Sequence, residues 1–90
     1  SNEPGYYKTG EYGIRIENLV VVQPVEDQPN MLHFETITLA PIDINAIDRA
    51  LMTADEVAWL NAYHKRVRET HAPHLDAATK AWLENATRPI

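Results

Sequence analysis

The spacing of apolar and polar residues changes character at about residue 42. Before it, β-branched residues crowd residues 12–25 and a second apolar stretch covers residues 31–40, both bounded by Gly or Pro, as strands usually are. After it, apolar residues recur every three or four positions, which is the spacing of one helix face. We therefore expect an α+β fold, with an antiparallel hairpin and a further strand in residues 1–42 and helices in residues 43–90.

The second half is predicted to be a helical hairpin. Thr53 and Glu56 are spaced as a capping box, in which each side chain bonds the backbone amide of the other residue. Pro73 interrupts the helical pattern, and a second helix follows. The predicted apolar stripe of the first helix is Val57, Trp59, Leu60, Tyr63, His64 and Val67, and that of the second is Leu75, Ala78, Trp82 and Ala86. We expect both tryptophans in the core and the helices packed on the strands.

Two glutamates are predicted to face each other across the first hairpin. If its tip lies near Gly10, residues whose numbers sum to 20 are opposite, which pairs Glu3 with Glu17. The Cβ atoms of such a pair are roughly 4.5–5.5 Å apart. Pro4 restricts Glu3 to an extended conformation. Two ionised carboxylates this close repel each other, so a cation, a shared proton or screening water must offset the repulsion.

The face that carries these glutamates admits two interpretations. Arg15 and Glu17 point to one side of the second strand, and Ile14 and Ile16 point to the other. The charged face could hold a metal ion, or it could be an ordinary solvated strand face. Spacing alone favours the solvated face, because charged strand faces are common.

Composition excludes several other classes of function. The 90 residues include 13 acidic and 8 basic ones, with a net charge of −5, so no basic stripe exists to follow nucleic acid. The chain has no cysteine, and its longest apolar run is far too short to span a membrane. His64, His71 and His74 are not spaced as zinc ligands usually are.

Two segments resemble a known pair of motifs. The run Glu3-Pro4-Gly5-Tyr6-Tyr7 and the run Gly13-Ile14-Arg15-Ile16-Glu17-Asn18 place their glutamates 14 residues apart. Together they resemble the last two metal-ligand motifs of the pita-bread metallopeptidases, and among these the Xaa-Pro aminopeptidases (aminopeptidase P). The remaining chain resembles the C-terminal extension of the longer members through Leu39-Ala40-Pro41-Ile42, Trp59-Leu60-Asn61, Tyr63-His64, Trp82-Leu83 and Pro89-Ile90.

The resemblance implies a role for three side chains. Glu3 would bind one metal and accept a proton during catalysis, Glu17 would bridge two metals, and Arg15 would orient an acidic ligand through a hydrogen bond. It also implies two manganese ions and a peptide substrate with proline in second position. The parent enzyme would be a cytoplasmic homodimer that binds neither nucleic acid nor membrane. Residues 1–42 would be the last strands of the catalytic domain and residues 43–90 the helical extension.

The family's site also needs two aspartates and a histidine from earlier in the fold, which these 90 residues do not supply. We therefore expect the isolated chain to be inactive, and we interpret Ser1 as a cut within a strand. Two alternatives stay open. The chain could be a stand-alone interaction or dimerisation module built on its helical hairpin, or the parent could have lost its metals. The presence of both Glu3 and Glu17 argues against the latter.

Overall fold

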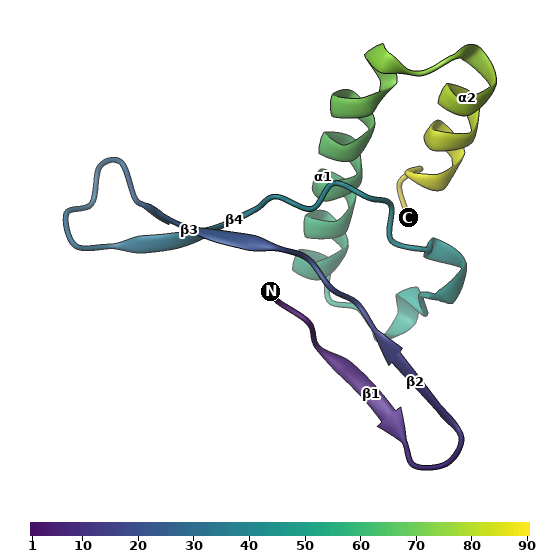
Figure 1. Ribbon diagram of the computed structural model, residues 1–90, viewed down its shortest axis with the longest axis horizontal. Coiled ribbons are helices and arrows are strands. Elements are labelled where there is room, and N and C mark those ends of the chain that lie inside the picture. Colours follow the sequence, from purple (N-terminus) through teal and green to yellow (C-terminus); the bar gives the residue numbers. More distant parts are fainter. The chain divides into compact units, whose positions relative to one another are not determined.

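The computed structural model describes all 90 residues, which form two compact units, Ser1–Thr38 and Leu39–Ile90 (Figure 1). The first unit contains four strands and the second contains the helices. The α+β class expected from the sequence is therefore confirmed. The units divide four residues before the domain boundary predicted at residue 42, and the assignment of these parts to catalytic and extension domains stays a prediction.

The first ribbon of the strand unit has the predicted register. Strands β1 (Gly5–Lys8) and β2 (Tyr12–Arg15) are antiparallel, and every partner pair sums to 20. Gly10 occupies the turn with φ of 73°, a left-handed conformation that glycine adopts without steric cost. The Glu11 N–H donates to the Lys8 carbonyl oxygen at 3.0 Å and closes the turn. The turn therefore fixes the pairing of the whole ribbon.

The single strand expected over residues 12–25 is interrupted after β2. The second part is β3 (Val20–Pro24), which pairs antiparallel with β4 (Leu32–Thr36) in a separate two-stranded sheet. The interruption lies where the hydrogen-bond partner changes: the backbone of Asn18 still pairs with Asn2, whereas the Leu19 N–H donates to the side chain of Thr38. The further strand expected over residues 31–40 is therefore shorter, and the unit has two ribbons rather than a hairpin and one extra strand.

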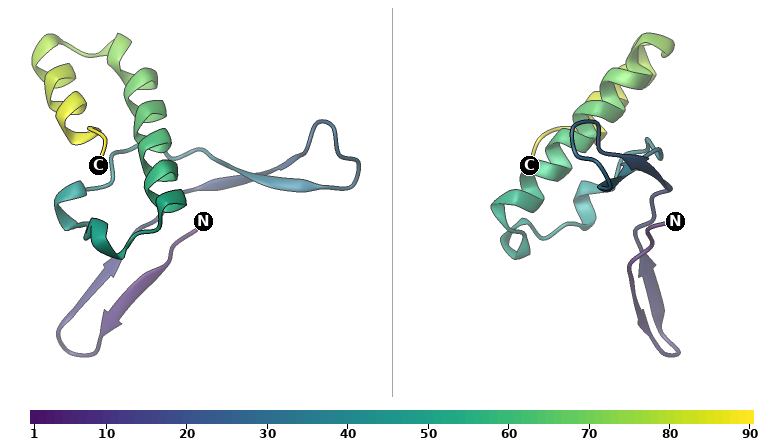
Figure 2. Two further views of the ribbon diagram at one scale, coloured as in Figure 1. Left: turned by 180° about the vertical axis from the view of Figure 1, so that it is seen from behind. Right: turned by 90° about the vertical axis from the view of Figure 1, so that its left-hand side faces the viewer.

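Helix α1 (Ala54–His71) begins at the predicted capping box, with both reciprocal hydrogen bonds between Thr53 and Glu56 present at 2.9 and 3.2 Å. The 3₁₀ turn η3 (Ala72–His74) contains the proline that ends the helical pattern. Helix α2 (Ala77–Ala86) starts where the Asp76 carboxylate accepts from the Thr79 N–H at 2.7 Å. The helical hairpin is therefore present, and Figure 2 shows the two helices from behind.

The helices bury their apolar faces within their own unit. Leu60, Tyr63 and Val67 of α1 meet Leu83 of α2 in the core. Partly buried residues that pack against it are Leu39, Ile42, Ile47, Met52, Leu75 and Ile90. Two 3₁₀ turns, η1 (Ile44–Ala46) and η2 (Arg49–Leu51), shape the segment that supplies several of these side chains. The segment that contains η1 and η2 therefore covers the helices, although the strands had been expected to do so. Helical periodicity gave no sign of this covering segment.

Both tryptophans were expected in the core, and this prediction was wrong. Trp59 is 52% exposed and Trp82 is 61% exposed. The Trp59 ring stacks on the Tyr63 ring with centroids 5.3 Å apart, so its inner face alone is covered. In α2 the buried position falls to Leu83, one residue beyond Trp82. Neither helix has the length and apolar character needed to cross a membrane.

Candidate functional site

The hydrogen bonds around Glu3 and Glu17 place the two residues opposite each other. The backbones of Asn2 and Asn18 exchange two hydrogen bonds, at 2.8 and 2.9 Å, on one side of the pair. On the other side the Ile16 N–H donates to the carbonyl oxygen of Pro4 at 3.2 Å. The glutamates therefore occupy a non-hydrogen-bonded position of the ladder, where opposed Cα atoms are only about 4.5 Å apart. The structure thus has the predicted register, which puts both residues on one face of the ribbon.

Arg15 and Tyr7 share this face, because opposed residues and every second residue along a strand point to the same side. The Arg15 Nε lies 3.4 Å from the Glu17 Oε2 atom. Hydrogen bonding with the Tyr7 side chain raises the pKa of Arg15, and the negative charges of Glu17 and Glu3 raise it further. Arg15 is thus held between a tyrosine and the carboxylate pair.

Two glycines leave room for the Tyr7 ring. A Cβ atom at Gly5 would lie 2.8 Å from the Tyr7 hydroxyl oxygen, and one at Gly13 would lie 2.7 Å from Tyr7 Cδ1. Real Cβ contacts essentially never come this close. The ring therefore lies flat over both glycines, which directs its hydroxyl toward Arg15. Glycine is needed here for close approach rather than for an unusual backbone conformation.

The register decides which of the adjacent residues Tyr6 and Tyr7 lies on the face of the glutamates. All partner numbers sum to an even number, so odd-numbered residues share the face of Glu3 and Glu17. Tyr7 belongs to that face. Tyr6 belongs to the other, where its ring lies 6.0 Å from the ring of Tyr12.

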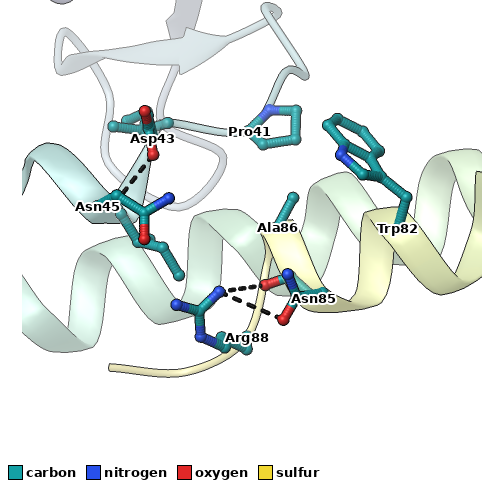
Figure 3. A pocket seen from close by; sticks show the side chains of 9 residues that line it. Pro41, Asp43, Asn45, Trp82, Asn85, Ala86 and Arg88 are labelled. Carbon is teal, nitrogen blue, oxygen red and sulfur yellow. Dashed lines mark hydrogen bonds between the residues drawn. The ribbon is translucent and has the colours of Figure 1, made fainter.

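The helical unit has a separate hollow of about 370 Å³ (Figure 3). Its lining residues are Pro41, Ile42, Asp43, Ile44, Asn45, Trp82, Asn85, Ala86 and Arg88. Its charged groups are engaged locally: the Asp43 carboxylate accepts from the Asn45 N–H at 3.0 Å, and Arg88 donates to the carbonyl oxygen of Asn85 at 2.9 Å. With one carboxylate, it offers no metal-binding set of ligands.

His64, His71 and His74 are not grouped with other possible metal ligands. No group of three or more His, Asp or Glu residues in the chain could hold a metal ion. His64 and His71 instead bond backbone atoms of residues 39–42, and His74 is exposed. Glu3 and Glu17 are therefore the part of a metal site that these 90 residues present.

A family model described as the C-terminal region of peptidase M24 matches residues 30–90. The chain belongs to this family. Aminopeptidase P1 of Lotus japonicus is 45% identical over the whole chain, and aminopeptidase P1 of Arabidopsis thaliana is 40% identical. A probable Xaa-Pro aminopeptidase P of Coprinopsis cinerea is 44% identical. The chain spans about 15% of the length of these peptidase M24 relatives.

A solved structure shows the same fold. The X-prolyl aminopeptidase of Caenorhabditis elegans, described as a cytosolic enzyme with a di-nuclear active site, superimposes on 98% of the chain with a TM-score of 0.81 and 37% identity. The chain matches 15% of that protein's length. The comparisons therefore confirm the resemblance to Xaa-Pro aminopeptidases that the two motifs indicated. The chain corresponds to the C-terminal region of these proteins.

The alternative of a stand-alone helical interaction module loses its main support in the structure. It depended on the apolar stripe of α1 being available to a partner. Val57, Leu60 and Val67 are all buried, and the last two lie in the core with Leu83. The stripe is used within the unit.

Proposed function

We propose that this chain is the C-terminal part of a two-metal aminopeptidase that releases the N-terminal residue ahead of proline. The observation that carries the proposal is the narrow opposed pair of Glu3 and Glu17, beside Arg15. The peptidase M24 family and the di-nuclear site of the structural neighbour support it.

The donor set at this face fits the metals expected. Carboxylate oxygens suit hard divalent ions such as manganese, and Glu3 and Glu17 would be the residues of this chain that hold them. Glu17 is the ligand proposed to bridge two ions and Glu3 the ligand proposed for one of them. When bound, such a metal pair lowers the pKa of water and polarises the peptide carbonyl.

The side chains of this chain have distinct proposed tasks. Glu3 accepts the proton that the attacking water gives up, because a carboxylate beside the nucleophile can act as a general base. Arg15 holds the carboxylate plane of Glu17 through its guanidinium. Tyr7, on the same face, is proposed to fix the direction of Arg15 by hydrogen bonding with it. These outer contacts orient metal ligands and raise the precision of the site.

The decisive experiment substitutes Glu17 in the whole protein. Glu17→Gln keeps the side-chain shape but removes the charge and one acceptor oxygen. We expect the bound manganese to fall below two ions per subunit and manganese-dependent cleavage of a Xaa-Pro peptide to be lost. Glu26→Gln, in the exposed loop after β3, is the matched control and should retain both properties. Full turnover by Glu17→Gln would refute the assignment of the bridging ligand.

We further propose that the whole protein is a cytosolic homodimer. The β3–β4 ribbon supports assembly or further packing, because Val22, Leu32 and Phe34 are each more than half exposed, and exposed apolar patches usually become covered. The molar mass of the whole protein in solution decides the point. A monomeric mass at micromolar concentration would contradict the dimer.

A further inference from the structure

Residues 39–42 take their backbone hydrogen bonds from side chains of α1 rather than from a strand. The Tyr63 hydroxyl donates to the Ala40 carbonyl oxygen at 2.7 Å and accepts from the Ala40 N–H at 3.3 Å. The His71 Nε2 atom lies 2.7 Å from the Leu39 carbonyl oxygen. At the other end of the segment, the Ile42 N–H donates to the His64 Nε2 atom at 3.0 Å. We call residues 39–42 and these three side chains the latch.

The hydrogen bond from Ile42 fixes the protonation state of His64. Because the Ile42 N–H is a donor, the His64 Nε2 atom must carry a lone pair, and the neutral ring bears its hydrogen on Nδ1. His64 is completely buried, and its Nδ1 atom has no hydrogen-bond partner. A second proton, on Nε2, would point at the Ile42 N–H and would leave a buried positive charge on the ring.

No neighbouring carboxylate compensates such a charge. Arg68, one turn further along α1, is the charged group that acts on the ring, and it has the same sign as protonated histidine. The Arg68 guanidinium is held by the Thr87 carbonyl oxygen at 2.8 Å, next to α2. On the segment side, the Asp43 carboxylate accepts from the backbone of Asn45. Burial, and then the charge of Arg68, lower the pKa of His64.

The exposed face of α2 offers no compensation either. Lys80 and Glu84 both point to solvent. The buried polar group on that side is the Thr87 hydroxyl, which donates to the Leu83 carbonyl oxygen at 2.6 Å. Tyr63, whose ring lies 5.7 Å from that of His64, uses its hydroxyl on Ala40. The ring can therefore gain a proton only if the packing around it opens.

We propose that His64 makes the latch acid-sensitive, so that protonation of its ring releases residue 42 from α1 while residue 39 stays bound. The two ends differ because of their partners. His71 faces a carbonyl oxygen and therefore donates, and a protonated histidine still donates. His64 faces an N–H and must accept, which a protonated histidine cannot do.

The direction of the pH effect follows from linkage. A histidine in the unfolded chain binds protons from about pH 6.5 downward, whereas the buried His64 resists protonation. The stability that neutral His64 contributes is thus fully present above that pH and is lost as the pH falls below it. The release of the Ile42 amide is the same loss of stability at low pH, confined to the latch.

The test follows backbone amide exchange of the 90-residue chain by NMR at pH 7 and pH 5. We expect the protection factor of the Ile42 amide, corrected for intrinsic exchange, to drop at least tenfold more than those of Leu60 and Val67. In His64→Gln the amide oxygen can accept from Ile42 but does not titrate, so Ile42 protection should not change with pH. His74→Gln, an exposed histidine, should behave as wild type.

Three results would overturn the proposal. These are constant Ile42 protection in the wild type, an equal drop in His64→Gln, and a drop in which Ile42, Leu60 and Val67 lose protection together. If His64→Gln does not fold, the wild-type ring signals decide the question. The proposal requires His64 to gain its proton over the same pH range in which Ile42 loses protection, and separate ranges would reject it.

Discussion

Gly13→Ala should impair the ribbon face that carries Glu3 and Glu17, although it replaces none of the polar side chains on that face. The added Cβ atom would lie 2.7 Å from Tyr7 Cδ1, whereas ordinary contacts begin at 3.4 Å. The ring must therefore retreat by about 0.7 Å, and its hydroxyl moves with it. The hydroxyl would move away from the Arg15 guanidinium, which weakens hydrogen bonding between the two side chains. Arg15 would lose the contact that directs it.

Removing a residue that orients a metal ligand typically lowers metal affinity or activity about 10–100-fold. We expect this range for Gly13→Ala and for Tyr7→Phe, measured as kcat/KM for a Xaa-Pro peptide in the whole protein. Melting temperature should change little, because Tyr7 is 62% exposed and its ring can swing outward. Manganese affinity, measured by calorimetry, should fall together with activity.

A double substitution separates a shared route from two independent defects. If Gly13 acts only by placing the Tyr7 hydroxyl, the double variant should be no worse than Tyr7→Phe alone, whereas independent effects would multiply. The matched control is Tyr6→Phe, which removes a hydroxyl from the opposite face. Multiplying losses, or an active Gly13→Ala variant, would refute the role given to the ring.

The core, the helix cap and the acid response of the helical unit each have a simple test. Leu60→Ala removes a side chain that is 3% exposed and should cost about 2–5 kcal/mol in urea unfolding, whereas Leu51→Ala, at 83% exposed, should change stability by less than about 0.5 kcal/mol. Equal costs would contradict the core described above. Thr53→Ala should cost about 1 kcal/mol by the same assay, and no cost would mean that the capping box does not persist in solution. The hydrogen bond from Thr79 lowers the pKa of Asp76, so this cap contributes fully above about pH 4 and is lost as the pH falls further. In Asp76→Asn, the free energy of unfolding should vary less with pH below about pH 4. An unchanged slope would contradict this role of the Asp76 carboxylate.

Local sequence rules predicted the register of the first ribbon and the start of α1 correctly. A glycine that accepts positive φ fixed the turn at Gly10, and the two-residue period of strands then brought Glu3 and Glu17 to one face. Thr53 and Glu56 marked the start of α1 because a capping box needs only residues three apart. These features depend on neighbours in the sequence, and side-chain type and spacing were sufficient to find them.

The roles expected for the glutamates and Arg15 came from resemblance to a family, and no geometry in these 90 residues measures them. The position of Tyr7 could have been found from the parity of the register. Its flat ring over Gly5 and Gly13 could not, because that contact depends on how the side chain packs.

Tertiary packing alone decided the remaining features. Apolar periodicity made Trp59 and Trp82 core candidates, yet the covering segment reached only the stripe that includes Leu60 and Leu83. Likewise, nothing near His64 in the sequence indicates that its ring accepts a hydrogen bond from Ile42, 22 residues earlier. Periodicity shows which residues can be buried. Which groups actually cover or hydrogen-bond these residues depends on how segments far apart in the sequence pack together.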